Sequence, residues 1–98
     1  MSYFKQLNSI KDNIKKQKIA LSKLEKFIDH SIVKAVNMLF KTNGKIVITG
    51  IGKSGYIGLK LSATLSSTGS PAIFINSSEA SHGDIGVIQS DDILIALS

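Results

Sequence analysis

The pattern of hydrophobic and polar positions changes its period near the middle of the chain. In the first part, apolar side chains recur at alternating steps of three and four residues, which is typical of one face of an α-helix. Only Gln17 interrupts the series, and neither proline nor glycine occurs in residues 1–43. We therefore expect a long first helix that packs on its own domain or on a partner subunit. A free-standing coiled coil would usually show more heptads and flanking charges of opposite sign, whereas the flanks here are mostly lysine, which favours packing in an oligomer. Its apolar positions are Tyr3, Leu7, Ile10, Ile14, Leu21, Leu24 and Ile28.

A second helix is predicted to follow, beginning near Asp29 or Ser31, because both residue types cap helix N-termini. Asn43 and Gly44 are predicted to end it, since both tolerate the left-handed conformation found after helices. The expected core face consists of Ile32, Val36, Leu39 and Phe40. Residues 1–43 are thus read as a helical arm.

From residue 44 onward, the pattern predicts a second domain, 44–98, with a different architecture. Short runs rich in β-branched residues predict strands at 45–49, 72–75 and 92–97. A helix is expected over 56–67, with Ile57, Leu61 and Leu65 on one face, and a mostly irregular segment over 76–88 with one helical turn around 79–82. Strands alternating with a helix predict an α/β fold with a doubly wound parallel sheet of about three strands.

Charge is distributed unevenly between the two parts. Residues 1–45 hold ten lysines against three acidic residues, a net charge of +7, and residues 46–98 carry −2. The chain has no arginine for bidentate contacts with bases or phosphates, so we read the lysines as a solvated helix face and expect no nucleic-acid partner. Without cysteine, a signal-peptide pattern or a membrane-length apolar run, a cytoplasmic protein without membrane contact is expected.

A glycine-rich loop of the form GxGxxG, Gly50–Gly55, lies between a predicted strand and a predicted helix. Glycines let the backbone approach an anion, which the first amides of a helix can bind. Lys53 adds a positive charge and Ser54 adds a hydroxyl donor.

Several interpretations of this loop compete. A dinucleotide site usually has an acidic residue after the second strand, where this chain has Asn76. A Walker A loop would need a glycine where Val47 stands. A phosphosugar loop needs glycines, hydroxyls and a basic group, and all are present. A tight turn without any ligand is the remaining alternative.

A second polar cluster occupies Ser77–Asp84. It contains His82, which can exchange protons near neutral pH, and two carboxylates that could serve as bases. These residues could equally be structural, with Asp84 capping a turn and His82 donating a hydrogen bond.

Three sequence motifs together resemble one known family. The spacing of GKSG, STGSP and EASHGD is similar to that in the sugar isomerase (SIS) domain of arabinose 5-phosphate isomerases, the KpsF/GutQ group. The resemblance covers about Lys45 to Leu97, the N-terminal part of that domain.

The resemblance implies a doubly wound fold, usually in a tetramer, and an enzyme that interconverts D-arabinose 5-phosphate and D-ribulose 5-phosphate for Kdo and lipopolysaccharide synthesis. No cofactor is implied. It also implies a catalytic role for Lys53 and substrate contacts by six residues. These are Gly52, Ser54, Gly55, Gly69, Ser70 and His82.

Two departures from the family pattern shape our expectations. Members commonly carry histidine where this chain has Asn76, and an amide is a poor zinc ligand, so no metal is expected. The family also continues past Ser98 into a serine-rich phosphate loop. We therefore expect a truncated SIS domain that is inactive alone. It could be a non-catalytic phosphosugar-binding module or a gene remnant. Alternatively, a homo-oligomer or a second polypeptide could complete its site.

Overall fold

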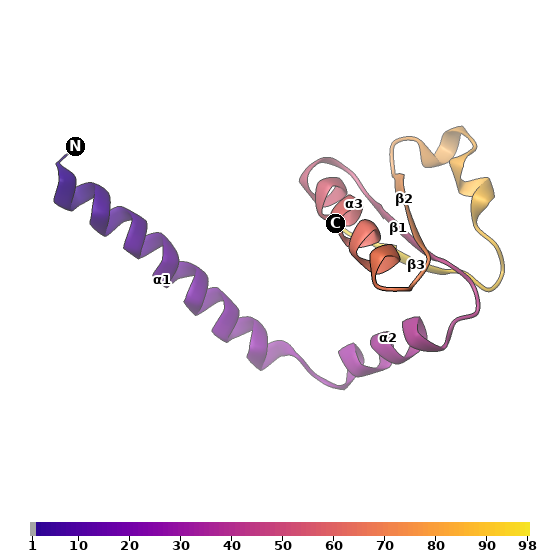
Figure 1. Ribbon diagram of the computed structural model, residues 1–98, viewed down its shortest axis with the longest axis horizontal. Helices are drawn as coiled ribbons and strands as arrows, with labels where there is room; N and C mark the ends of the chain where they lie inside the picture. The colour runs from indigo at the N-terminus through magenta and orange to yellow at the C-terminus, as the bar shows by residue number, and fades with distance from the viewer. Residues whose placement is uncertain (1) are drawn as a thin grey trace. The chain divides into compact units, whose positions relative to one another are not determined.

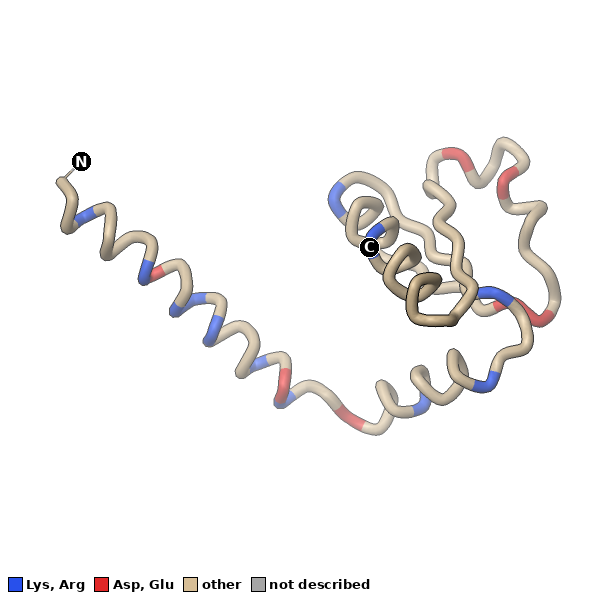
Figure 2. The backbone as a smooth tube through the Cα atoms, in the orientation of Figure 1, with Lys and Arg blue, Asp and Glu red and all other residues tan. Residues whose placement is uncertain are grey.

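The computed structural model describes residues 2–98 and divides into two compact units, the first ending at Ala35 and the second comprising Val36–Ser98. The first unit is dominated by helix α1, Tyr3–Phe27 (Figure 1). The hydroxyl of Ser2 caps this helix by accepting a hydrogen bond from the Lys5 amide. Lysines are spaced along the whole length of α1 (Figure 2), and the first unit by itself buries no residue of this helix.

Helix α2, His30–Lys41, begins where the sequence predicts. The Asp29 carboxylate accepts hydrogen bonds from the Ser31 hydroxyl at 2.6 Å and the Ser31 amide at 2.9 Å. These bonds lower the pKa of Asp29 and identify it as the cap.

The reason for the glycine after α2 differs from our prediction. Gly44 does not adopt a left-handed conformation. Instead, a Cβ atom at this position would lie 2.4 Å from the carbonyl oxygen of Asp91. Gly44 is therefore required by close approach of two backbone segments.

The sheet contains three parallel strands in the order β2-β1-β3, which confirms the predicted fold class. Their bounds are β1 Ile46–Gly50, β2 Ala72–Asn76 and β3 Ile93–Ala96. The central strand β1 is flanked on both sides, and the apolar core consists of Ile46, Val47, Ile48 and Ile75.

Helix α3, Gly52–Ser67, packs on strands β1 and β2 (Figure 1). Its buried residues are Gly55, Gly58 and Ser62, whereas Ile57 of the predicted face is 64% exposed. A Cβ atom on Gly58 would lie 3.0 Å from the Phe74 ring. Small residues therefore bring the helix close to the sheet, and the predicted apolar face was only partly right.

The connection from β2 to β3 contains two short 3₁₀ turns, Ala80–His82 and Asp84–Val87, where a single helical turn was predicted. Residues from this connection surround an apolar hollow together with residues of the sheet. The hollow is lined by Val47, Thr49, Ile75, Ala80, Ile85, Ile88 and Leu94.

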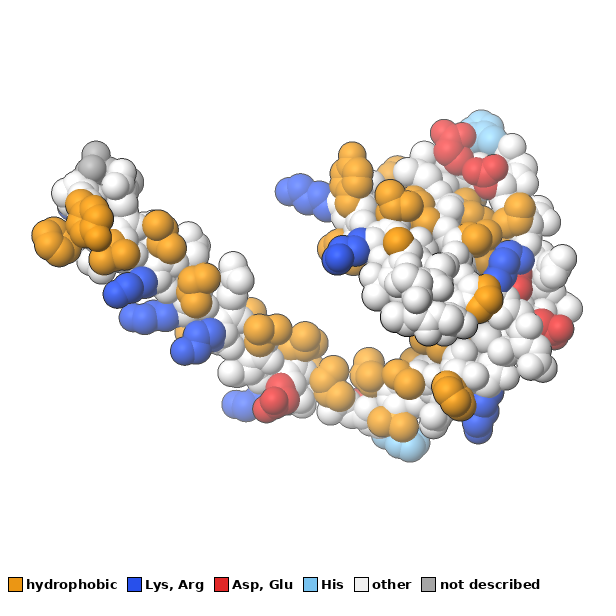
Figure 3. All heavy atoms as spheres, in the orientation of Figure 1, with side chains coloured by type: hydrophobic (Ala, Val, Ile, Leu, Met, Phe, Trp, Pro, Cys, Tyr) orange, Lys and Arg blue, Asp and Glu red, His pale blue; other side chains and the backbone are white. Residues whose placement is uncertain are grey.

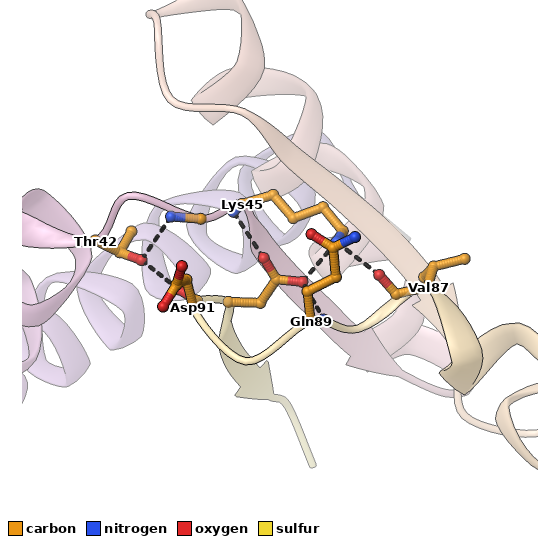
Figure 4. A network of polar contacts seen from close by, with 7 residues as sticks. Thr42, Lys45, Val87, Gln89 and Asp91 are labelled. Carbon is orange, nitrogen blue, oxygen red and sulfur yellow. Dashed lines mark hydrogen bonds and ion pairs between the residues drawn. The ribbon is translucent and has the colours of Figure 1, made fainter.

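A polar network ties the starts of β1 and β3 together (Figure 4). The Asp92 carboxylate accepts hydrogen bonds from the backbone amide and the ammonium group of Lys45 and from the amide of Gln89. The Lys45 ammonium also donates to the carbonyl of Val87, at 2.6 Å. The network fixes the last part of the β2–β3 connection against the sheet.

Candidate functional site

The glycine motif forms a shorter loop than predicted, because α3 begins at Gly52 and only Ile51 separates it from β1. Glycine at position 50 makes this turn possible. A Cβ atom there would lie 3.1 Å from the Gly55 amide nitrogen and the Ser54 carbonyl group. Gly52 has a φ of +61°, a conformation that L side chains rarely adopt.

The first amides of α3 are available to an external anion. The first helical hydrogen bond runs from the Gly55 amide to the Ile51 carbonyl, at 3.3 Å. Within residues 2–98, the amides of Gly52, Lys53 and Ser54 donate to no acceptor of the chain. No side chain caps this end of the helix either. Three unpaired donors and the positive end of the helix dipole thus point out of the carboxyl end of β1.

A pocket of about 220 Å³ lies beside these amides. It combines the glycine turn with side chains from α3 and from the end of β2. The residues that line the pocket are Gly52, Gly55, Tyr56, Leu59, Phe74 and Asn76. Of these, the sequence predicted ligand contact for Gly52 and Gly55 and assigned no such role to the other four.

The side chain of Asn76 forms hydrogen bonds with the segment that follows β2. Its side-chain oxygen accepts hydrogen bonds from the Ser78 amide at 3.0 Å and the Ser78 hydroxyl at 2.7 Å. The Ser77 amide donates to the Gly50 carbonyl at 3.1 Å, which ties this segment to the glycine turn. The side-chain amide oxygen of Asn76 is therefore engaged in the turn that follows β2.

Lys53 lies in the first turn of α3, and its side chain is exposed. Among the described residues, Lys45 and Asp92 form the one ion pair, so Lys53 has no acidic partner within this part of the chain. Lys53 is available to an incoming anion, although it does not line the pocket.

Gly69 and Ser70 lie at the other end of α3, at the amino ends of the strands. A helix of 16 residues is about 24 Å long, far longer than a pentose phosphate. Both residues follow the C-cap Thr68, and their amides bond to the last turn of the helix, Ser70 to the Leu65 carbonyl and Gly69 to the Ser66 carbonyl. The structure therefore does not bring them to the Gly52 pocket, and their substrate contact stays a prediction.

His82 ends the first 3₁₀ turn of the β2–β3 connection and is exposed. It follows β2 by six residues and so leaves the same edge of the sheet as the glycine turn. It does not line the pocket beside Gly52. Its contact with substrate also stays a prediction.

Residues 2–98 lack two further features. No group of three histidine, cysteine, aspartate or glutamate residues is placed to bind one metal ion there. Among the same residues, no helix combines the length and the apolar character needed to cross a membrane.

Comparison with known proteins agrees with this geometry. The model of the SIS domain family matches residues 38–98. Arabinose 5-phosphate isomerase KdsD of Yersinia pestis is 46% identical over 78 residues, which is 80% of this chain. The enzyme of the same name from Pseudomonas aeruginosa is 42% identical over 92 residues, or 94% of this chain.

A solved structure resembles the whole chain. The protein of Escherichia coli CFT073 in complex with arabinose 5-phosphate superposes with a TM-score of 0.92 and 34% identity over 100% of this chain. The matched region is 24% of the Yersinia enzyme, 28% of the Pseudomonas enzyme and 52% of the solved chain. The chain thus spans about a quarter of the length of these curated relatives.

Proposed function

This chain belongs to the SIS domain family, and from that premise we propose that the start of α3 binds the phosphate group of a sugar phosphate. The observation that carries the proposal is the set of three unpaired amides at Gly52, Lys53 and Ser54 beside an open pocket. The solved relative in complex with arabinose 5-phosphate supports a sugar phosphate as the ligand.

The expected affinity is low. Backbone amides and the helix dipole contribute about 0.3–1 kcal/mol to an exposed anion, and one lysine adds a charge-assisted hydrogen bond of about 1.5–3 kcal/mol. These contributions overlap and must offset the freedom lost on binding. A dissociation constant near or above ~1 mM is therefore expected for this chain.

The test is an NMR titration of the chain with arabinose 5-phosphate and, separately, with arabinose. Only the phosphate ester should shift the amides of Gly52–Ser54. Lys53→Ala should abolish the shifts, and Lys60→Ala, which removes the same charge from the same helix, should preserve most of them. Equal losses in both variants, or shifts confined to the lysine-rich arm, would show unspecific charge attraction.

For the whole protein, we propose aldose–ketose isomerisation between arabinose 5-phosphate and ribulose 5-phosphate, the activity that the names of the relatives support. This reaction moves a proton between neighbouring carbons, which requires a base, an acid and support for the negatively charged intermediate. In the proposed mechanism, the α3 amides anchor the phosphate and Lys53 stabilises negative charge.

Residues 2–98 supply no evident base to this pocket, because its lining contains neither a carboxylate nor an imidazole. We therefore propose that the chain by itself binds the phosphosugar without turning it over, which is the behaviour of a binding module. A coupled assay would decide, and turnover of roughly 1 per second or more would contradict this part of the proposal while leaving the binding site intact.

A further inference from the structure

The segment between helix α2 and strand β1 contains an asparagine that is followed by glycine, Asn43–Gly44, and no other asparagine of the sequence has glycine after it. Asparagine before glycine is the sequence most prone to deamidation, because a glycine nitrogen carries no neighbouring side chain that would hinder its attack. Asn43 is exposed on the surface (the white and orange atoms of Figure 3 include this segment), so water, the other reactant, has access to it. The segment therefore has the chemistry of a modification site.

Deamidation proceeds in two steps. The backbone nitrogen of Gly44 gives up its proton and attacks the Cγ atom of Asn43. A new N–C bond forms, and the side-chain nitrogen leaves with that proton as ammonia. Water then opens the resulting succinimide ring at either of its carbonyl groups. The product is aspartate or isoaspartate, and in isoaspartate the main chain runs through the side chain and is one carbon longer.

The folded structure restrains the nitrogen that would have to attack. The Gly44 amide donates to the hydroxyl oxygen of Thr42 at 3.1 Å, and that hydroxyl donates to the carbonyl oxygen of Asp91 at 2.6 Å (Figure 4). The next amide, that of Lys45, donates to the Asp92 carboxylate at 2.9 Å. The peptide groups on both sides of Gly44 are therefore fixed by a segment that lies 47 to 49 positions further along the chain.

We propose that Asn43 is a deamidation site that the fold protects through the hydroxyl of Thr42, so that modification occurs when the sheet unit opens. The hydrogen bond to Thr42 engages the proton that Gly44 must lose, and the fixed backbone keeps the Gly44 nitrogen from turning toward the Asn43 side chain. The proposal concerns the second unit alone and does not depend on the phosphosugar site.

The packing that protects this sequence also requires it. A Cβ atom at position 44 would lie 2.4 Å from the carbonyl oxygen of Asp91, so the fold needs glycine there. Modification should in turn hinder refolding. Either product adds a negative charge just after the C-terminus of α2, where the helix dipole disfavours it. Isoaspartate also lengthens the main chain beside the close contact between Gly44 and Asp91.

NMR of the nitrogen-labelled chain follows the reaction at each asparagine, because a side-chain amide signal disappears when its nitrogen leaves. The chain is incubated at mildly alkaline pH with and without urea. Asn43 should lose its signal faster in urea than in buffer. Asn8, which is followed by Ser9, is the internal control and should react more slowly than Asn43 in urea. Equal rates for Asn43 with and without urea, or no loss in either, would overturn the proposal.

Variants of Thr42 test the role of the hydroxyl. In buffer, Thr42→Val should speed the loss of the Asn43 signal by about two- to tenfold, the effect of one hydrogen bond on a rate. In urea it should change nothing, and Thr42→Ser, which retains the hydroxyl, should behave like the parent chain in both conditions. A Thr42→Val chain that reacts no faster than the parent in buffer would contradict the proposal.

A further variant separates loss of the hydroxyl from loss of stability. Ile48→Ala destabilises the same unit but keeps Thr42, because Ile48 lies in the apolar core. Both variants are compared at urea concentrations that give them equal free energies of unfolding. Thr42→Val should still lose the Asn43 signal faster, and equal rates would overturn the protective role of Thr42.

Discussion

The two units of this chain use their apolar residues in opposite ways. In the sheet unit, strand β1 is covered by its neighbours, and Val47 and Ile48 have no exposed surface. In the first unit, α1 has an equally regular apolar pattern over 25 residues, and that unit by itself buries none of them. A regular apolar pattern therefore identifies the face of a helix or strand that can pack, but it does not identify the element that packs on it.

The largest expected effect is the loss of a core side chain in the sheet unit. Ile48→Ala should destabilise this unit by about 2–5 kcal/mol, because the side chain is fully buried and its removal leaves a cavity. Urea unfolding monitored through NMR signals of β1 would measure the change. Ile19→Ala in the arm is the control and should change the same transition by no more than about 0.5 kcal/mol. Equal losses would mean that the two units unfold together.

A smaller effect is expected where α3 approaches the sheet. Gly58→Ala should destabilise the sheet unit by about 1–3 kcal/mol through overpacking, because the new Cβ atom would meet Phe74 at 3.0 Å and Ile48 at 3.1 Å. This outcome opposes helix propensity, which favours alanine by about 1 kcal/mol. Gly86→Ala has no neighbour within 4 Å and should be nearly neutral in the same unfolding experiment. A stabilising Gly58→Ala would show that the helix can move away from the sheet.

The polar network at the start of β1 should make the stability of the sheet unit depend on pH. The side-chain hydrogen bond from Lys45, together with backbone amides, lowers the pKa of Asp92, whose side chain is only 2% exposed. A lowered pKa contributes stability that is present above the ordinary carboxyl pKa and is lost as pH falls through the lowered value. Unfolding measured between neutral and strongly acidic pH should show this loss. Asp92→Asn should reduce the loss of stability at acidic pH, and Asp91→Asn should leave that loss unchanged.

The sequence by itself determined the type and order of the elements, and it predicted an anion site at the glycine turn. Periodicity, caps and β-branched runs are local signals, so they placed two helices, three parallel strands and α3 with boundary errors of only a few residues. The motif spacing also identified Gly52 and Gly55, which do line the pocket. The predictions of secondary structure succeeded because each depends on residues close together along the chain, whereas contact of Gly52 and Gly55 with a ligand stays a prediction.

Only the tertiary structure decided which residues meet across the fold. The buried face of α3 contains Gly55, Gly58 and Ser62, because small residues permit close approach and carry little hydrophobic signal. Strand pairing brings Asn76 beside Gly50, whereas the length of α3 separates Gly69 from the same pocket. The contacts of Gly58 with Phe74 and of Asn76 with Gly50 join residues more than fifteen positions apart, and their geometry follows from the tertiary packing of the sheet and helix rather than from any local pattern.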